Sequence, residues 1–284
     1  TRPTDEATMS FLCACKGTVY FLFFKTFSQK NAFYSCFFCN FALMIAKTDA
    51  IVLHTIKYGD KKIIVDMFTK EMGRMAFAVT VSSKNTGKMK KQYFQPMTML
   101  ELTCDLRPGQ QLQRLKDVRL TAPASSICLC ADKLAIALFV AEFLYYSLRS
   151  EQRNVTLYDY ICDSLQWLDA ANDGYANFHL TFLMRISRFL GFFPNLEDYH
   201  EGCVFDMRNS CFSMTVPMHH DFIAADDAAL LQQLMRMNFA TMRLFRMSRH
   251  ERNRIAEVLV EYYRIHIPGF PMLKSLEVLQ QLFD

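Results

Sequence analysis

The stretch "YGDKKIIVDMFTKEMGRMAFAV", from Tyr58 to Val79, contains two runs in which apolar residues alternate with small or polar ones. The runs lie at 62–69 and 75–81, and the polar segment "KEMGR" separates them. Alternation with a period of two predicts β-strands that bury one face. Lysines crowd both ends of the stretch, and it contains no obvious catalytic side chain. The stretch therefore predicts a positively charged β-hairpin, and the charge needs an explanation other than catalysis.

The same pattern continues on both sides of this hairpin. Alternating runs at 50–56, 96–104 and 111–120 predict three more strands, with turns at 58–60 and at "RPG" (107–109). Within 75–81, large residues alternate with small ones, which suits the tapering interior of a closed barrel. Five short strands in a small barrel are typical of the oligonucleotide-binding (OB) fold, whose open face and loops hold single strands.

After Pro123 the hydrophobic period becomes helical. A capping box of Ser248 and Glu251 marks the start of one helix, and Gly191 and Pro194 mark the end of another. The segment "GCVFDMRNSCFSM" (202–214) predicts a small hairpin. We expect helices at 131–150, 155–171, 176–194, 226–237, 248–267 and 272–283.

The sequence therefore predicts an α+β multidomain protein. An OB-fold β-barrel occupies 45–122, and an all-α helical domain occupies 123–284, with a small β-hairpin insertion near 199–217.

Residues 1–44 differ in pattern from the rest of the chain. Their apolar runs are broken by lysines, and none reaches the ~18 apolar residues of a membrane helix. The segment also lacks the single basic start and cleavage site of a signal peptide. The spacings of Cys13 with Cys15 and of Cys36 with Cys39 do not favour a metal site. We expect 1–44 to be an extension outside the natural protein, which would begin at Met44; a weak membrane anchor is the alternative.

Charge is distributed unevenly along the chain. Residues 1–44 carry 4 basic and 2 acidic side chains, 45–122 carry 14 and 7, and 123–284 carry 14 and 19, which gives +2, +7 and −5. A basic module joined to an acidic one indicates a polyanionic partner for the first, although ordinary surface charge is the simpler alternative.

The motifs of common enzymes are missing. Gly87-Lys88 lacks the first glycine and the Ser or Thr of a phosphate-binding loop, and the chain contains no GxGxxG, GxSxG or HExxH. Ten cysteines are too dilute for a disulfide scaffold, so reduced intracellular thiols are expected. A cluster of possible zinc ligands lacks the short chelate spacing of closed sites; it consists of His200, Cys203, Cys211, His219 and His220. The sequence therefore indicates a protein that is not an enzyme.

Several segments, in this order, resemble the RecO family of bacterial recombination mediators. The segment "KTDAIVLHTIKYGDKKIIVDMFTKEMGRMAFAV" (47–79) is similar to its N-terminal barrel, with the Tyr-Gly-Asp turn at 58–60 and "FT" followed by Gly73. "FQPMTMLEL" (94–102) resembles its Gln-Pro strand. "LGFFPNL" (190–196) and "YYRIHIPGFPMLKSLEVL" (262–279) resemble its helical segments. The similarity runs from Met44 to the C-terminus.

The resemblance implies a function in DNA repair and homologous recombination. Members of the family bind single- and double-stranded DNA and anneal complementary strands. With RecR they help RecA replace the single-stranded-DNA-binding protein (SSB), whose acidic C-terminal tail they bind through the helical domain. It also implies a cytoplasmic, nucleoid-associated protein without a membrane partner. Many members carry a four-cysteine zinc site, of which this chain retains only Cys203 and Cys211, so we expect no metal and no other cofactor.

Three groups of residues are candidates for these functions. Phosphate contacts are expected from basic residues at turns and in the loop after 81: Lys57, Lys61, Lys62, Lys70, Arg74, Lys84, Lys88, Lys90 and Lys91. Base stacking is expected from Tyr58, Tyr93 and Phe94, for which core packing is the alternative. Docking of the acidic SSB tail is expected from arginines: Arg243, Arg246, Arg249, Arg252 and Arg254. An adjacent groove would be lined by Met235, Met237, Met242 and Met247.

Two other functions fit the same pattern. An RNA-binding OB-fold protein would prefer RNA to DNA of matched sequence. A scaffold that binds only proteins would bind SSB or RecR without binding DNA at low salt.

Overall fold

The computed structural model describes residues 14–15, 18–19, 44–81, 89–107, 109–122 and 125–281. Two short strands, β1 (Ala14–Cys15) and β2 (Thr18–Val19), pair antiparallel with each other. The rest of the expected N-terminal extension, including Cys13, Cys36 and Cys39, lies outside the described residues.

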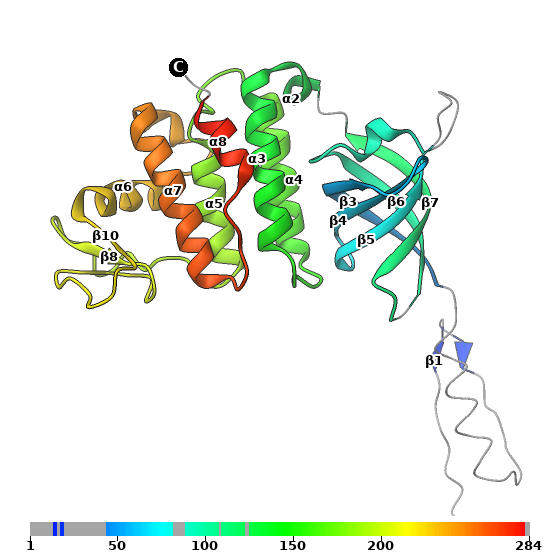
Figure 1. Cartoon of the computed structure of the whole chain (residues 1–284), viewed down its shortest axis with the longest axis horizontal. Coiled ribbons are helices and arrows are strands. Elements are labelled where there is room, and N and C mark those ends of the chain that lie inside the picture. Colours follow the sequence, from blue (N-terminus) through cyan, green and yellow to red (C-terminus); the bar gives the residue numbers. More distant parts are fainter. Residues whose placement is uncertain are drawn as a thin grey trace, which may run out of the picture. The chain divides into compact units, whose positions relative to one another are not determined.

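Five strands form a closed barrel in the order β3-β4-β5-β7-β6 (Figure 1). They are β3 (Met44–Lys57), β4 (Lys62–Thr69), β5 (Gly73–Thr80), β6 (Met99–Leu106) and β7 (Leu112–Ala122). The long strand β3 pairs with β6 through its first half and with β4 through its second, and a bulge lies between Val52 and His54. Neighbours are antiparallel except β5 and β7, which run parallel. The predicted OB-like barrel is confirmed.

Alternation along the strands decides which side chains fill the barrel. Phe77 and Val79 of β5 are buried inside with Val65 and Met67 of β4, and the intervening residues are more exposed. Two boundaries differ clearly from the prediction, because β3 begins at Met44 and not at 50, and β6 begins at Met99 and not at 96. Met97 has φ of +64°, a left-handed conformation that ends regular strand geometry before that point.

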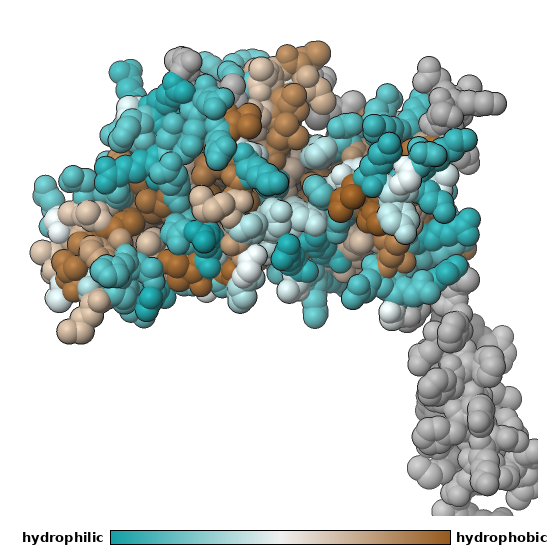
Figure 2. Space-filling view, in the orientation of Figure 1, coloured by the Kyte–Doolittle hydropathy of each residue, from teal (hydrophilic) through white to brown (hydrophobic). Residues whose placement is uncertain are grey.

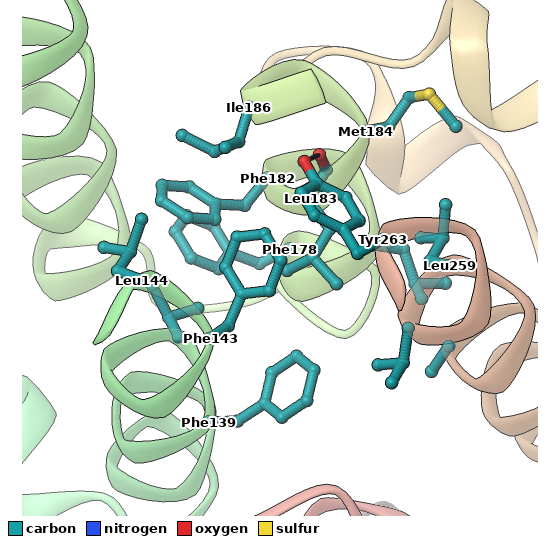
Figure 3. Close-up of a cluster of buried hydrophobic side chains, with 14 of the residues drawn as sticks. Phe139, Phe143, Leu144, Phe178, Phe182, Leu183, Met184, Ile186, Leu259 and Tyr263 are labelled. Atoms are coloured by element: carbon teal, nitrogen blue, oxygen red, sulfur yellow. Dashed lines mark hydrogen bonds between the residues drawn. The ribbon is translucent and has the colours of Figure 1, made fainter. Parts of the chain in front are cut away.

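The C-terminal region is built from helices that pack around an aromatic core. They are α2 (Ser125–Leu129), α3 (Ala131–Ser147), α4 (Val155–Ala170), α5 (Phe178–Phe189), α6 (Ala225–Arg236), α7 (Arg249–His266) and α8 (Lys274–Gln280). Figure 3 shows Phe143 of α3, Phe178 and Phe182 of α5, and Tyr263 of α7 pointing toward one another. The rings of Phe143 and Tyr263 meet edge to face at 4.6 Å. The predicted helical region is therefore present, with helices a few residues shorter than expected.

Helix ends follow the local sequence. Asn154 caps α4 by accepting a hydrogen bond from the Leu157 N–H at 3.0 Å. The predicted capping box at the start of α7 is confirmed, because Ser248 Oγ accepts from Glu251 N–H and the Glu251 carboxylate accepts from Ser248 N–H.

The predicted insertion is part of a three-stranded sheet in the order β10-β8-β9, and β10 lies beyond the predicted bound of 217. β8 (Val204–Asp206) and β9 (Cys211–Ser213) form the expected hairpin, and β10 (Phe222–Ile223) adds a strand that the sequence pattern did not reveal. Asp206 fixes the hairpin turn by accepting hydrogen bonds from the backbone N–H groups of Arg208 and Asn209. Burial alone would raise the pKa of Asp206, but these hydrogen bonds outweigh it and lower that pKa.

The barrel and the helices share a packed contact. Ile51, Leu53 and Phe68 of the barrel strands belong to the same buried cluster as the helical core. At the β4–β5 turn, Gly73 lies so close to the backbone of Glu151 and Gln152 that a Cβ atom there would be 2.4 Å from the Gln152 carbonyl carbon. The Arg74 N–H donates to the Glu151 carbonyl oxygen at 3.1 Å. The β4–β5 turn is therefore in direct contact with the segment between α3 and α4.

Candidate nucleic-acid interface

The turn between β3 and β4 presents several exposed basic side chains. Lys57, Lys61 and Lys62 are exposed, and none of them forms an ion pair within the described part of the chain. Backbone hydrogen bonds fix the turn, from Tyr58 N–H to the Lys62 carbonyl and from Val81 N–H to the Lys61 carbonyl, both at 2.9 Å. The lysines are thus held on an ordered backbone.

A cavity of about 340 Å³ lies next to this turn. Three cations line it, Lys62 of β4, Arg107 at the end of β6 and Arg114 of β7, and the other described residues of the lining carry no acidic side chain. The other lining residues are Ala78, Val79, Thr80, Gln110, Leu112 and Gln113. The lining thus carries three positive charges, and the nearby Asp105, which lies opposite Arg114, is paired with Lys116, so this concave surface is a favourable place for an anion.

Arg107 and Arg114 were missed by the sequence reasoning. Their place beside Lys62 depends on the parallel pairing of β5 with β7, in which Ala78 lies opposite Arg114. The signal that could have found them is the OB topology itself, because the loop between the fourth and fifth strands lies next to the loop between the first and second in this fold.

Another face of the barrel, formed by β3, β6 and β7, is also rich in basic residues, but two of its lysines have acidic partners. Lys47 Nζ lies 2.8 Å from a Glu101 carboxylate oxygen, and Lys116 Nζ lies 2.5 Å from Asp105. The β3–β4 turn and the cavity therefore carry an excess of positive charge that this face lacks. Figure 2 shows that hydrophilic residues cover much of the visible face of the barrel.

Two of the predicted phosphate-binding residues lie in the contact with the helices instead. Lys70 Nζ lies 2.8 Å from Asp159 of α4, and this hydrogen bond raises the pKa of Lys70. Arg74 pairs with Asp66 at 3.0 Å and stacks on the Tyr145 ring, 4.3 Å from its centroid. Because the Arg74 side chain is only 11% exposed, the structure assigns it to this contact and not to a DNA-binding surface.

The loop after β5 is described only in part. Lys84 and Lys88 lie outside the described residues, so their expected role stays a prediction. Lys90 and Lys91 lie at the start of the short helix η2 (Lys91–Phe94), where Lys91 is exposed and Lys90 is half-buried.

The three aromatic candidates differ in exposure. Tyr58 is 65% exposed on the β3–β4 turn and remains a candidate for stacking. Tyr93 is half-buried against the barrel core. Phe94 is only 1% exposed and belongs to that core, where its carbonyl oxygen accepts a hydrogen bond from Thr55 Oγ1 at 2.7 Å. The structure therefore corrects the stacking role expected for Phe94, because a buried ring cannot meet a base.

The five arginines predicted to bind the SSB tail differ in whether they form contacts within the chain. Arg243 and Arg246 are exposed on the segment around η3 (Met242–Leu244). Arg249 donates to the Gln280 carbonyl, and Arg252 donates to the Met247 carbonyl. Partial burial lowers the pKa of Arg252. Arg254 pairs with Asp227 at 2.6 Å.

Only Arg243 and Arg246 thus stand outside these internal contacts. The expected methionine groove is corrected as well, because its four members lie in the core: Met235, Met237, Met242 and Met247.

The possible zinc ligands are dispersed around the insertion. Cys203 is buried and Cys211 is half-buried, both as free thiols, and His219 pairs with Asp206 at 3.3 Å. Across the described ranges, no three His, Cys, Asp or Glu side chains are close enough to share a metal ion. Within the same ranges, no helix is both long and apolar enough to cross a lipid bilayer.

Comparison with known proteins supports the fold and identifies the family. A model described as recombination protein O N terminal matches residues 44–124, and one described as recombination protein O C terminal matches 131–277. Curated relatives named DNA repair protein RecO are 49% identical over 242 residues in Bacteroides fragilis and 48% over 241 residues in Phocaeicola vulgatus. A third, from Porphyromonas gingivalis, is 36% identical over 247 residues. Each match covers 85% of this chain and 100% of the relative. The chain therefore belongs to the RecO family of DNA repair proteins.

Proposed function

We propose that this chain binds DNA through the basic end of its barrel, anneals complementary strands, and helps RecA, together with RecR, to replace SSB on single-stranded DNA. The observation that carries the proposal is the uneven pairing of barrel cations. Among the described residues, Lys57, Lys61 and Lys62 have no ion-pair partner, whereas Lys47 and Lys116 are paired with carboxylates. A polyanion gains most where the cations have no internal partner, since no existing ion pair must be broken.

The chemistry of this surface suits a sequence-independent contact. Lysines at a turn reach phosphate oxygens, which carry no sequence information, and each phosphate neutralised contributes about 0.7 to the salt slope on a single strand. Tyr58 adds an exposed ring on which a base can stack. Annealing needs no bond to be made or broken in DNA, which fits a surface that offers cations and an aromatic ring.

Partner binding is assigned to the helical region. Arg243 and Arg246 flank Leu244, which is exposed, so this segment offers two cations around an apolar side chain to the acidic SSB tail. The assignment of RecR and RecA as partners rests on the family resemblance. This role places the chain at the nucleoid in the bacterial cytoplasm.

The decisive experiment compares DNA binding and annealing in a triple variant and a matched control. Lys57→Ala/Lys61→Ala/Lys62→Ala removes the unpaired turn cations, and we expect its salt slope on a single-stranded oligonucleotide to fall by about 2. A control with the same charge change removes three exposed cations elsewhere: Lys47, Arg236 and Arg264. Annealing by the first triple variant with the wild-type salt dependence would contradict the assigned surface.

The same assay separates the alternative functions. Adding SSB to the strands should make annealing sensitive to a competing peptide of the SSB tail, and Arg243→Ala/Arg246→Ala should reduce that sensitivity. Tighter binding to RNA of matched sequence would favour the RNA-binding alternative. Binding of SSB or RecR without any DNA binding at low salt would favour the protein-only scaffold.

A further inference from the structure

The side chain of Gln113 connects three points of the loop between β6 and β7. Its Oε1 accepts a hydrogen bond from the Arg107 N–H at 2.8 Å. Its Nε2 donates to the Arg107 carbonyl at 3.1 Å and to the Gln110 carbonyl at 2.6 Å. Gln113 is only 5% exposed, so these hydrogen bonds are shielded from water. A buried amide that uses both its donor and its acceptor groups in this way fixes the backbone of Arg107 and Gln110 relative to β7.

The loop has few other constraints among the described residues. A hydrogen bond from Gln110 N–H to the Arg107 carbonyl closes the turn at 3.2 Å, and Gly109 allows it with φ of +78°. No hydrogen bond or ion pair is formed by the Arg107 side chain within the part of the chain that the structure describes. The Arg107 guanidinium is therefore available to a ligand, and Gln113 fixes the backbone from which that side chain extends.

This arrangement brings three cations together at the cavity. Along β7 the side chains alternate, so that Gln113 is buried and Arg114 is exposed, and both line the cavity. Lys62 enters from β4, where it lies opposite Thr80 of β5. Arg107 completes the set from the loop. Two strands and a loop that are distant in sequence thus place three positive charges on one concave surface.

We propose that this cavity, lined by Lys62, Arg107 and Arg114, is a phosphate-binding subsite of the DNA interface, and that Gln113 is the positioning residue that holds Arg107 in it. The inference rests on the proposed function and goes beyond it by naming the ligand group and the residue that arranges the site. Guanidinium groups match phosphate oxygens in a two-pronged geometry that lysine alone lacks. A volume of about 340 Å³ lies at the lower end of ligand pockets, which suits a phosphoryl group with part of its sugar.

Two sources can supply this phosphoryl group. An internal phosphodiester carries one negative charge, whereas a 5′-terminal phosphate monoester carries about 1.5 to 2 at pH 7, as phosphorylated side chains do. Oligonucleotides of the same sequence, with a 5′-phosphate or a 5′-hydroxyl group, distinguish the two sources. Tighter binding of the phosphorylated strand identifies the terminal group, and equal binding identifies the internal phosphodiester.

The test measures the affinity and salt slope for both oligonucleotides in the full chain. Arg107→Ala should weaken binding about tenfold, as expected for the loss of a hydrogen-bonded charge, and should lower the salt slope by about 0.7. Gln113→Met keeps a similar volume but removes all three hydrogen bonds, and it should reproduce most of the Arg107→Ala effect. Gln233→Met, at an exposed position on α6, is the control and should bind as the wild type does.

A double-mutant cycle separates positioning from general destabilisation. If Gln113 acts through Arg107, then Arg107→Ala/Gln113→Met should bind no more weakly than Arg107→Ala alone. Additive losses, or wild-type salt slopes in both single variants, would overturn the inference. In that event continued loss of binding by Lys57→Ala/Lys61→Ala would leave the proposed function intact. Failure of the wild type to bind any oligonucleotide at low salt would instead reject the proposed function itself.

Discussion

Replacing Gly73 by alanine should weaken the contact between the barrel and the segment that joins α3 to α4. Gly73 has φ of +73°, which costs an L-residue about 1 to 2 kcal/mol. The added Cβ would also lie 2.6 Å from the carbonyl oxygens of Glu151 and Gln152, and these are backbone atoms that cannot rotate away. The turn must therefore move off the helical region.

Moving the turn away from the helical region lowers the free energy of unfolding further, in addition to the effect of the positive φ. The hydrogen bond from Arg74 N–H to the Glu151 carbonyl would be lost, which is worth about 0.5 to 1.5 kcal/mol. The ion pair of Lys70 with Asp159 is partly exposed to solvent and adds little. We therefore expect Gly73→Ala to lower the free energy of unfolding by about 1.5 to 3.5 kcal/mol.

Equilibrium unfolding in denaturant, followed by far-ultraviolet circular dichroism, measures this loss. Gly269→Ala is the matched control, because Gly269 has φ of +72° and no atom within 4 Å of the added Cβ. The control should lose only the conformational part, about 1 to 2 kcal/mol. Equal losses in the two variants would show that the close approach at Gly73 contributes nothing to the free energy of unfolding.

Three further predictions concern other parts of the molecule. Phe94→Ala should lower the free energy of unfolding by about 3 to 5 kcal/mol, because the ring is buried. The salt slope of DNA binding should stay unchanged. A changed salt slope with unchanged stability would contradict this prediction. Complete burial lowers the pKa of His179 from 6.5 to about 3. Between these two pH values the unfolded chain binds a proton that the folded chain excludes. The free energy of unfolding should therefore fall by about 1.4 kcal/mol for each pH unit below pH 6.5 in this window. His179→Leu should remove that part of the pH dependence, measured by unfolding at pH 7 and pH 5.5, and an unchanged dependence would argue against it. Glu142→Ala removes the carboxylate that accepts hydrogen bonds from the N–H groups of Lys274 and Ser275. The local stability of α8 against hydrogen exchange should therefore fall by about 1 kcal/mol. Unchanged exchange in α8 would count against this capping role.

The barrel was predictable because its strands follow a local rule. In β5 the large residues at Phe77 and Val79 are buried and the small ones between them are not, and that period of two is visible in the sequence. The helices were predictable for the same reason, with caps such as Ser248 that act within one turn. Two boundaries in the barrel were predicted wrongly: β3 already begins at Met44, and β6 begins only at Met99, after Met97 adopts a left-handed conformation that its side chain does not indicate.

The candidate site was harder to predict because it depends on contacts between distant segments. Lys70 looks like a free turn lysine until α4 brings Asp159 next to it, 89 positions later. Phe94 follows two lysines and a tyrosine, and the sequence left base stacking and core packing as alternatives; the structure places its ring in the barrel core. Arg107 and Arg114 reach the cavity only through the parallel pairing of β5 and β7, which hydrophobic periodicity does not specify.

The shared core limits how the chain can be divided for experiments. Ile51, Leu53 and Phe68 are covered by helices rather than by other strands. A truncated protein ending after β7 would expose these three side chains to solvent and would be prone to self-association, which could be mistaken for cooperative binding to oligonucleotides. Point substitutions in the intact polypeptide are therefore a safer way to dissect its activities than excised fragments.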